Sequence, residues 1–313
     1  MTRGKAWQIG GPCRVCLACR ASRRAEKELP SGAEAKDKNM ATIAIGQQMG
    51  SGGFELAKAA AQRLGARLIT VDELFSEAAR RYQVEPQRLR VFDEREPHFW
   101  DWLTTDTVRL VAYLDAVTVK YLQEDRTVLI GRTLPLFVPY GVSHVLRVRT
   151  VAPLALRIHR TIEDEGVSAQ QAERLVPQSD REIQARVKSM RQVEVEDPQL
   201  YDVVLNTAST PIADLAEVLC DLALAVEKHC AANSHRLLSD ACVTSQVRAA
   251  LIAHPQVGHA PIAVATSDGV VTLRGDSLVP PWDRLVREVV AQVEGVTSVR
   301  LETSERPIPP RAG

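Results

Sequence analysis

Short apolar runs alternate with amphipathic stretches along most of the chain, from residue 41 to about residue 230. Runs rich in β-branched residues predict buried strands over residues 41–45, 67–71, 127–130, 144–149 and 201–205. Apolar positions recur at helical spacing between these runs, for example over about 106–123. Strands that alternate with helices form parallel sheets covered on both faces, so we expect an α/β fold.

Two helix starts lie between the fourth and the fifth predicted strand. Ser168 with Gln171, and Ser179 with Glu182, both have the spacing of a capping box. In this motif the side chain of each residue accepts a hydrogen bond from the free backbone N–H of the other at the start of a helix. We therefore expect two separate helices, one beginning at each serine.

The first predicted strand leads into a glycine-rich turn and then into a helix. Such a turn can hold a phosphate, because glycine lets backbone N–H groups approach an anion and the helix N-terminus adds positive potential. The alternative is a plain tight turn, but the strand and the helix on either side favour phosphate binding. The residues expected to contact phosphate are Gly46, Gly50, Ser51, Gly52 and Gly53.

The turn departs from the full phosphate-binding pattern G-x-x-x-x-G-K-[ST]. When Gly52 is aligned with the second glycine of the pattern, Gly53 stands at the lysine position and Phe54 at the hydroxyl position. Glu55, one residue later, carries no hydroxyl either. The turn therefore lacks both the lysine that contacts the terminal phosphates and the hydroxyl that contacts magnesium.

A smaller unit follows residues 233–238, which have the character of a linker. We expect this unit to be a small α/β domain over residues 239–302, and the proline-rich residues 303–313 to be a disordered tail. The Asp-Gly pair at its centre supplies a hairpin turn that requires positive φ angles. Its expected elements are a helix over 240–253, a hairpin turning at Asp268-Gly269, a helix over about 281–293 and a strand over 296–301.

The composition is ordinary for a soluble globular protein, with 45% hydrophobic and 25% charged residues. The 39 basic residues balance the 39 acidic ones, so no global positive field attracts nucleic acid. No apolar run is long enough to span a membrane, and the basic N-terminus lacks the apolar core of a secretory signal. Six cysteines without such a signal favour reduced thiols, and we therefore expect a cytoplasmic protein.

The first 39 residues differ from the rest of the chain in charge. They hold nine Lys/Arg and four Asp/Glu and show no apolar period, which indicates a disordered basic arm over residues 1–39. Within it, Cys13, Cys16 and Cys19 have the spacing of part of a metal-ligand set. Three thiolates do not close a tetrahedral site, so metal binding and an unstructured extension both stay open.

Five segments carry a resemblance to a known family: Gly50–Gly53, Val71-Asp72, Leu129–Arg132, Ala152–Arg157 and Tyr201–Thr207. In order and separation they resemble the cytidylate kinase-like family, a branch of the P-loop nucleoside monophosphate kinases, over about residues 41–230. The resemblance implies a P-loop NTPase-type parallel sheet flanked by helices over residues 40–232. It also implies transfer of a phosphoryl group from ATP to CMP, dCMP or a related nucleotide, with Mg²⁺.

The small C-terminal unit resembles the BON domain, a small α/β module associated with membranes or ligand sensing. The resemblance is carried by Asp268–Val271, Leu273, Gly275, Gly295-Val296 and Val299. It implies that residues 239–302 bind a small ligand or a lipid surface, and that they regulate the preceding domain. This part of the chain carries no evident catalytic set.

The family resemblance also implies roles for individual arginines. In the monophosphate kinases, lid arginines close over the transferring phosphates, which implies catalytic roles for Arg157 and Arg181. By the same resemblance, Arg160 and Arg186 are expected to contact substrate, and Arg132 to bind the phosphate of the acceptor. The alternative is that the arginines on the predicted helices only form a solvent-exposed face, as runs of charges on helices commonly do.

Asp72 follows the second predicted strand and is expected to orient magnesium or a substrate group during catalysis. Its alternative role is to cap the helix that begins beside it. Thr133 replaces the aspartate that follows glycine–arginine in well-studied cytidylate kinases, so selectivity for cytosine is open. Among these candidate residues we expect no side chain to bind a metal ion directly.

Two functions from different classes are compatible with these observations. The first is a nucleoside monophosphate kinase-like enzyme that is regulated by the BON-like module. The second is a catalytically degenerate protein that senses nucleotides or phosphorylated metabolites without turnover. We favour the enzyme, because backbone amides, magnesium and arginines can share the charge stabilisation that the lysine otherwise supplies.

Overall fold

The computed structural model describes residues 41–89, 105–276 and 278–302. All of them belong to one compact unit, Asn39–Gly313. The expected basic arm over residues 1–39, with its three cysteines, and the expected tail over residues 303–313 lie outside the described residues.

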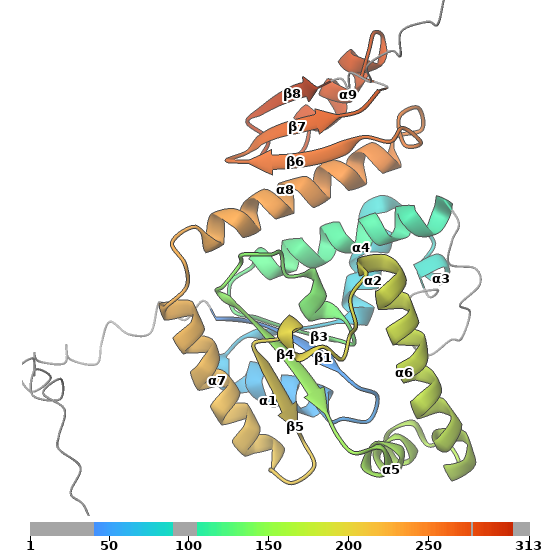
Figure 1. The fold of residues 1–313 in the computed structure, drawn as a ribbon, viewed down its shortest axis with the longest axis vertical. Coiled ribbons are helices and arrows are strands. Elements are labelled where there is room, and N and C mark those ends of the chain that lie inside the picture. Colours follow the sequence, from blue (N-terminus) through green and yellow to red (C-terminus); the bar gives the residue numbers. More distant parts are fainter. Residues whose placement is uncertain (1–40, 90–104, 277, 303–313) are drawn as a thin grey trace, which may run out of the picture. The chain divides into compact units, whose positions relative to one another are not determined.

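The described part of the chain contains a parallel sheet of five strands, which confirms the expected α/β fold (Figure 1). The strand order is β2-β3-β1-β4-β5, and each neighbouring pair is parallel. Because all five strands are parallel, their carboxyl ends meet at one edge of the sheet, with β1 in the centre. The strands are β1 (Thr42–Gln47), β2 (Arg67–Thr70), β3 (Thr127–Gly131), β4 (Val145–Val151) and β5 (Val203–Asn206).

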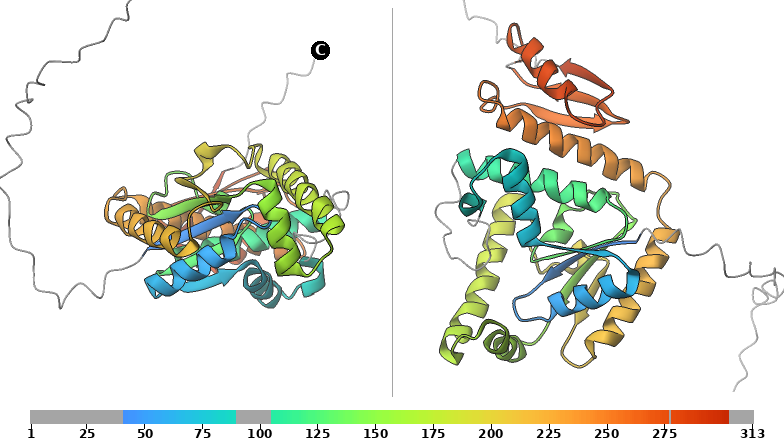
Figure 2. Two further views of the ribbon diagram at one scale, coloured as in Figure 1. Left: turned by 90° about the horizontal axis from the view of Figure 1, so that it is seen from below. Right: turned by 180° about the vertical axis from the view of Figure 1, so that it is seen from behind.

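Each face of this sheet is buried by a different set of helices. On one face, α1 (Gly53–Leu64) and α7 (Ile212–Lys228) pack side by side against alternate residues such as Ile43 and Ile45 (Figure 2). On the other face, α2 (Val71–Tyr82) and α4 (Thr105–Gln123) cover Ala44, Ile69 and Leu129, with the short α3 (Pro86–Leu89) beside α2. Successive strand residues point to opposite faces, so one run of apolar residues supplies both cores.

One of the two capping boxes predicted between β4 and β5 is wrong. After α5 (Leu154–Glu165), the chain forms a single helix, α6 (Ala169–Arg191), which Ser168 and Gln171 cap reciprocally as expected. Ser179 does not begin a helix. It is buried in the middle of α6, and its Oγ accepts a hydrogen bond from Arg132, so its side chain serves a tertiary contact instead.

The expected linker over residues 233–238 is also wrong, because α8 (Ser234–Ala253) already begins at its second residue. Apolar residues on one face of α8, including Leu238 and Cys242, pack against α4 in the core of the large domain. Residues on another face, including Val243 and Val247, enter the core of the small domain. A helix with two buried faces has no amphipathic pattern, so the sequence of its first turn gives no helical signal.

The small domain has a three-stranded sheet in the order β6-β7-β8. Its first two strands, β6 (Ala263–Ser267) and β7 (Val270–Arg274), form the expected hairpin, with φ of 52° at Asp268 and 74° at Gly269. Positive φ at both central residues matches the twist of the strands. The sheet is completed by β8 (Ser298–Glu302), parallel to β7, and packs with α8 and α9 (Trp282–Ala291).

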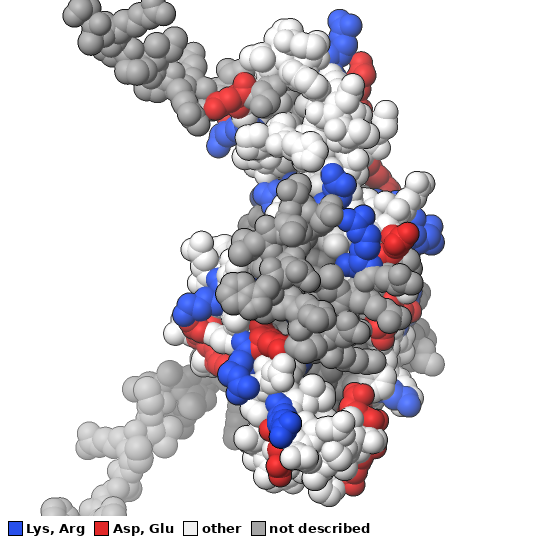
Figure 3. Space-filling model, turned by 90° about the vertical axis from the view of Figure 1, so that its right-hand side faces the viewer, with Lys and Arg blue, Asp and Glu red and all other residues white. Residues whose placement is uncertain are grey.

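Charge and hydropathy on the described part of the chain give no sign of a membrane-spanning element. None of the helices within residues 41–89, 105–276 and 278–302 combines the length and the apolar character that a crossing requires. On the face drawn in Figure 3, basic and acidic side chains are interspersed over the described residues.

Candidate active site

A cleft of about 560 Å³ lies at the carboxyl ends of β1, β2 and β3. In open parallel sheets, ligands bind outside these strand ends, where adjoining loops diverge. The cleft takes its lining from the glycine loop (residues 47–53), the start of α2 and the end of β3, and from Asp164 and Glu165 at the end of α5. Phe54 and Glu55, in the first turn of α1, also line the cleft. The other lining residues are Gln47, Met49, Gly50, Gly52, Thr70, Val71, Asp72, Ile130, Gly131 and Arg132.

The glycine loop presents backbone amides to this cleft. Gly50 and Gly52 both have φ of 71°, and Gly52 is the N-cap of α1. At Gly50 a side chain is excluded as well, because a Cβ atom there would lie 2.3 Å from the carbonyl oxygen of Arg157. Within the described residues, the amides of Gly50, Gly52 and Gly53 donate no hydrogen bond to a protein acceptor. They are therefore available to an anion at the helix N-terminus.

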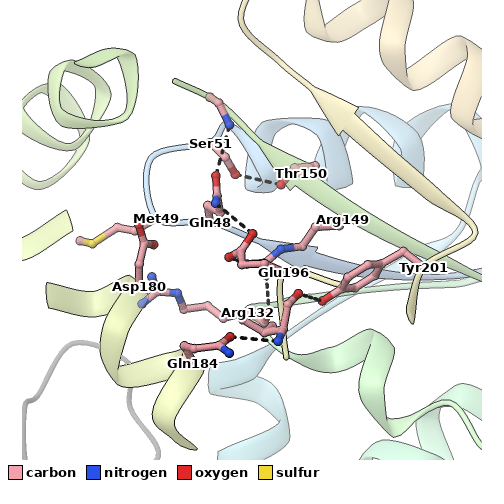
Figure 4. A network of polar contacts seen from close by, with 12 residues as sticks. Gln48, Met49, Ser51, Arg132, Arg149, Thr150, Asp180, Gln184, Glu196 and Tyr201 are labelled. Atoms are coloured by element: carbon pink, nitrogen blue, oxygen red, sulfur yellow. Dashed lines mark hydrogen bonds and ion pairs between the residues drawn. The ribbon is translucent and has the colours of Figure 1, made fainter. Parts of the chain in front are cut away.

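Hydrogen bonds from the ends of β4 and β5 fix the loop from behind (Figure 4). The hydroxyls of Ser51 and Thr150 lie 2.8 Å apart, and the amide of Gln48 donates to the Thr150 carbonyl at 3.1 Å. The Thr207 hydroxyl donates to the Ser51 carbonyl at 2.6 Å. Ser51 is fully buried by these contacts, so it supports the loop, whereas Gly46 lies inside β1 and not in the loop.

The position of the missing lysine is closed by neighbouring side chains. A Cβ atom at Gly53 would lie 2.7 Å from Gln47 Cβ, from Gln47 Oε1 and from Thr150 Oγ1. Such distances are shorter than any that real Cβ atoms tolerate, so a longer side chain at residue 53 must displace Thr150 from Ser51. The loop is therefore packed around a glycine at residue 53, and no space is left where the lysine side chain would begin.

Arg132 and Asp72 line the same cleft as the glycine loop. Arg132 follows β3 and is 5% exposed, and its guanidinium donates to Ser179 Oγ on α6. Asp72 is the second residue of α2 and is exposed. The helix is capped by Thr70, which forms a capping box with Glu73, so the alternative role of Asp72 as the helix cap is wrong.

The two arginines on α5 lie together behind the glycine loop and line no part of the cleft given above. Arg157 forms a two-pronged ion pair with Asp180 of α6, with N···O distances of 2.8 and 3.1 Å. It also donates to the carbonyl oxygens of Ala152 and Met49. Arg160 donates to the hydroxyl and the carbonyl of Thr207, at 2.9 and 3.0 Å. Both side chains thus brace the loop in this conformation.

The two candidate arginines on α6 occupy different surroundings. Arg181 is exposed next to Asp180, and the structure does not bring it to the cleft. Arg186 is half-buried and lines a small apolar cavity of about 80 Å³ together with Phe75, Phe137 and Met190. Arg132 lines this cavity as well as the cleft, so Arg186 lies on the same side of the site as Arg132.

Sequence reasoning missed a buried arginine on β4. Arg149 is 3% exposed and donates to the Arg132 carbonyl oxygen and to Glu196, both at 3.0 Å (Figure 4). The other carboxylate oxygen of Glu196 accepts from the Gln48 amide at 3.5 Å. An arginine within a predicted buried strand is itself a sign of a buried ion pair, because a buried strand rarely carries a charge without a partner.

Tyr201 and Gln184 hold the segment that carries Glu196. The Tyr201 hydroxyl donates to the Val195 carbonyl at 2.8 Å, and the Val195 amide donates to the Gln184 side chain at 3.0 Å. Burial raises the pKa of Tyr201, so the phenol keeps the proton that it donates. Glu196 is consequently placed by two contacts to the backbone of the preceding residue, Val195, and not by its own ion pair alone.

The cleft carries carboxylates that suit a hydrated divalent cation. Glu55 lies in the first turn of α1 and Asp72 in the first turn of α2, and both line the cleft. Mg²⁺ is usually bound by one or two carboxylates, water and substrate phosphates. Among the residues that the structure describes, no group of three or more His, Cys, Asp or Glu side chains could hold a metal alone. A metal here would need phosphate oxygens as further ligands.

A search for related families matches residues 42–209, more than half of the chain, with the cytidylate kinase-like family. The chain belongs to this family. Residues 239–304 match the BON domain. Both matches confirm the resemblances seen in the sequence, and they support a nucleoside monophosphate kinase-type fold for the large domain.

Individual relatives are more distant. The chain is 26% identical over 174 residues to a protein named cytidylate kinase from Methanopyrus kandleri, covering 53% of this chain and 84% of that protein. An uncharacterised protein from Eubacterium ventriosum is 15% identical with a TM-score of 0.44, covering 58% of this chain and 98% of that one. Shikimate kinase from Acinetobacter baumannii, solved with shikimate, is also 15% identical, with a TM-score of 0.36 and coverage of 59% and 94%. These structural scores are too low to carry an argument about function.

Proposed function

We propose that this protein is an ATP-dependent nucleoside monophosphate kinase that phosphorylates CMP, dCMP or a related acceptor. One observation carries the proposal: in a chain of the cytidylate kinase-like family, free loop amides and Arg132 face one cleft. The amides suit the phosphates of a donor, and Arg132 suits the phosphate of an acceptor. Phosphoryl transfer depends on such positioning and charge stabilisation more than on covalent help from the protein.

On the donor side, the amides of Gly50, Gly52 and Gly53 would bind the phosphates of ATP, and Ser51 would hold the loop in place. Mg²⁺, when bound, would supply positive charge that offsets the negative charge of the phosphates. Glu55 and Asp72 are the residues placed to hold its water ligands, because both carboxylates line the cleft. No side chain at residue 53 takes part, since the packing leaves no room for one.

On the acceptor side, Arg132 would bind the phosphate of the nucleoside monophosphate, and Arg186 would assist from α6. The apolar cavity beside them would take part of the nucleoside. Thr133 lines that cavity where the aspartate of well-studied cytidylate kinases would stand. Discrimination between cytosine and other bases therefore rests on weaker hydroxyl contacts, which favours a broader acceptor range.

Two further arginines would neutralise charge that develops during transfer. Arg157 donates to the Met49 carbonyl of the glycine loop and would carry its charge close to phosphates bound by that loop. Arg181 follows Asp180, the α6 residue that pairs with Arg157. A movement of α6 toward the cleft would therefore bring the Arg181 side chain to the phosphates. Arg160 would act through Thr207, because its guanidinium donates to the hydroxyl and the carbonyl of that residue.

The small domain would regulate the kinase domain through the shared helix α8. We propose functional parts over residues 40–232 and 239–302, with α8 entering both cores. Arg81 of α2 donates to Gln246 of α8 at 2.6 Å, and α2 begins at the cleft with Val71 and Asp72. A small ligand or lipid surface bound by the BON domain could thus act on Asp72. We place the reaction in the cytoplasm, where both nucleotides occur.

The full chain should be incubated with ATP, Mg²⁺ and each common nucleoside monophosphate, and the products separated by chromatography. We expect ADP together with CDP or dCDP, and slower formation of other diphosphates. The Arg132→Ala variant should raise the KM for the acceptor at least about tenfold, since a charge-assisted contact to phosphate is lost. No turnover with any acceptor, despite measurable ATP binding, would contradict the kinase and support the sensing alternative.

A further inference from the structure

The glycine loop and Arg132 are connected to each other by one buried guanidinium. Nη1 of Arg149 donates to the carbonyl oxygen of Arg132, on the acceptor side of the cleft. Nη2 donates to Glu196, whose second carboxylate oxygen accepts from Gln48 of the glycine loop. Figure 4 shows Arg149 and Glu196 between Gln48 and Arg132. The two sides of the cleft are thus held at a set separation by three hydrogen bonds.

The surroundings of Arg149 allow it little freedom. Its side chain is 4% exposed, whereas that of Glu196 is 52% exposed, so the carboxylate keeps contact with water while the guanidinium does not. The guanidinium carbon lies 5.9 Å from the centre of the Tyr201 ring. Within the described part of the chain, its Nε is buried without a hydrogen-bond partner. A buried charge with an unsatisfied donor costs stability, which indicates a role other than stabilising the fold.

We propose that Arg149 is a positioning residue that sets the distance between the glycine loop and Arg132, and so aligns the donor with the acceptor. This inference rests on the proposed kinase function. A planar, forked side chain suits this task, because its two terminal nitrogens reach two partners in fixed directions. A lysine at the same position keeps the charge but cannot hold both partners in this geometry.

The same strand supplies a matched control. Arg147 lies two residues before Arg149 and so points to the same face of β4. It forms an equally close pair with Asp202, with N···O distances of 2.7 and 3.1 Å, but at a half-exposed position away from the cleft. Arg147→Lys therefore breaks a forked arginine–carboxylate pair on this strand without touching the site.

Hydrogen–deuterium exchange on the full chain tests the positioning role without relying on turnover. In Arg149→Lys we expect exchange to rise at least about fivefold in peptides covering residues 47–53 and in those covering 131–134, because both contacts weaken. Glu196→Gln should loosen only the glycine loop, since the bond from Arg149 to the Arg132 carbonyl is retained. Arg147→Lys should change neither segment.

Kinetics give the second measurement. In Arg149→Lys we expect kcat/KM to fall by about a hundredfold through kcat, with ATP binding changed much less, because misalignment costs more in the transition state than in binding. Exchange and kinetics of Arg149→Lys equal to those of Arg147→Lys would overturn the proposal. If Arg149→Lys does not fold, Glu196→Gln decides the question. Exchange of residues 47–53 in Glu196→Gln that equals wild type would then overturn the proposal. A wild-type chain without turnover refutes the kinase function, whereas the exchange result still decides the positioning role.

Discussion

Returning a lysine to the glycine loop should damage this protein rather than repair it. In Gly53→Lys the new Cβ atom meets three atoms at 2.7 Å, and only Gln47 Oε1 is at the end of a flexible side chain. Thr150 must move, which breaks its 2.8 Å contact with Ser51. Overpacking of this kind costs about 1–3 kcal/mol and the lost hydrogen bond about 1 kcal/mol. We therefore expect the free energy of unfolding to fall by about 2–4 kcal/mol.

Urea unfolding followed by circular dichroism measures this loss, and titration with a fluorescent ATP analogue measures nucleotide binding. Phe54→Lys is the matched control, because it adds the same charge one residue later, at a side chain that is already 44% exposed. We expect the control to change the free energy of unfolding by less than about 1 kcal/mol. A Gly53→Lys variant that is as stable as Phe54→Lys and binds ATP more tightly than wild type would refute the reasoning.

Two further predictions concern regions outside the loop. Leu238→Ala in α8 should destabilise the large domain by about 2–5 kcal/mol in urea unfolding, because this side chain is 1% exposed beneath α4. Leu224→Ala on α7, at a 40% exposed position, should cost less than about 1 kcal/mol, and equal losses would show that α8 does not complete that core. Burial and the stacked His235 lower the pKa of His144 to about 4, so stability should fall as the pH drops from about 6.5 toward 4, where only the unfolded chain binds this proton. His144→Asn should flatten that slope in unfolding curves between pH 4.5 and 7, and an unchanged slope would assign it to other groups.

Most of the sheet could be predicted from the sequence because its three central strands, β3, β1 and β4, are buried on both faces. Continuous apolar runs such as residues 127–130 are conspicuous, and the order of strands and helices limits the topology to few possibilities. The Asp268-Gly269 turn was predictable for a local reason, since positive φ at both residues requires such a pair. The cleft followed from topology, because strand ends meet at one edge of the sheet.

The errors arose where a side chain serves a distant partner. Ser179 has the local spacing of a helix cap, but its hydroxyl binds Arg132, which is 47 residues away in sequence. The start of α8 lacks a periodic pattern because two cores share its surface. Arg149 was overlooked as a site residue because its role depends on Glu196 and Gln48, which come from other segments. Such contacts depend on the tertiary fold, and no local spacing reveals them.

The central claim is that the cleft transfers a phosphoryl group between nucleotides, and ³¹P NMR of the full chain with ATP, Mg²⁺ and CMP tests it most directly. The spectrum resolves every product in one sample over time. We expect the signals of ADP and CDP to grow at equal rates while those of ATP and CMP fall. Unchanged ATP, or ADP that accumulates with inorganic phosphate and without CDP or any other nucleoside diphosphate from a panel of acceptors, would contradict the account.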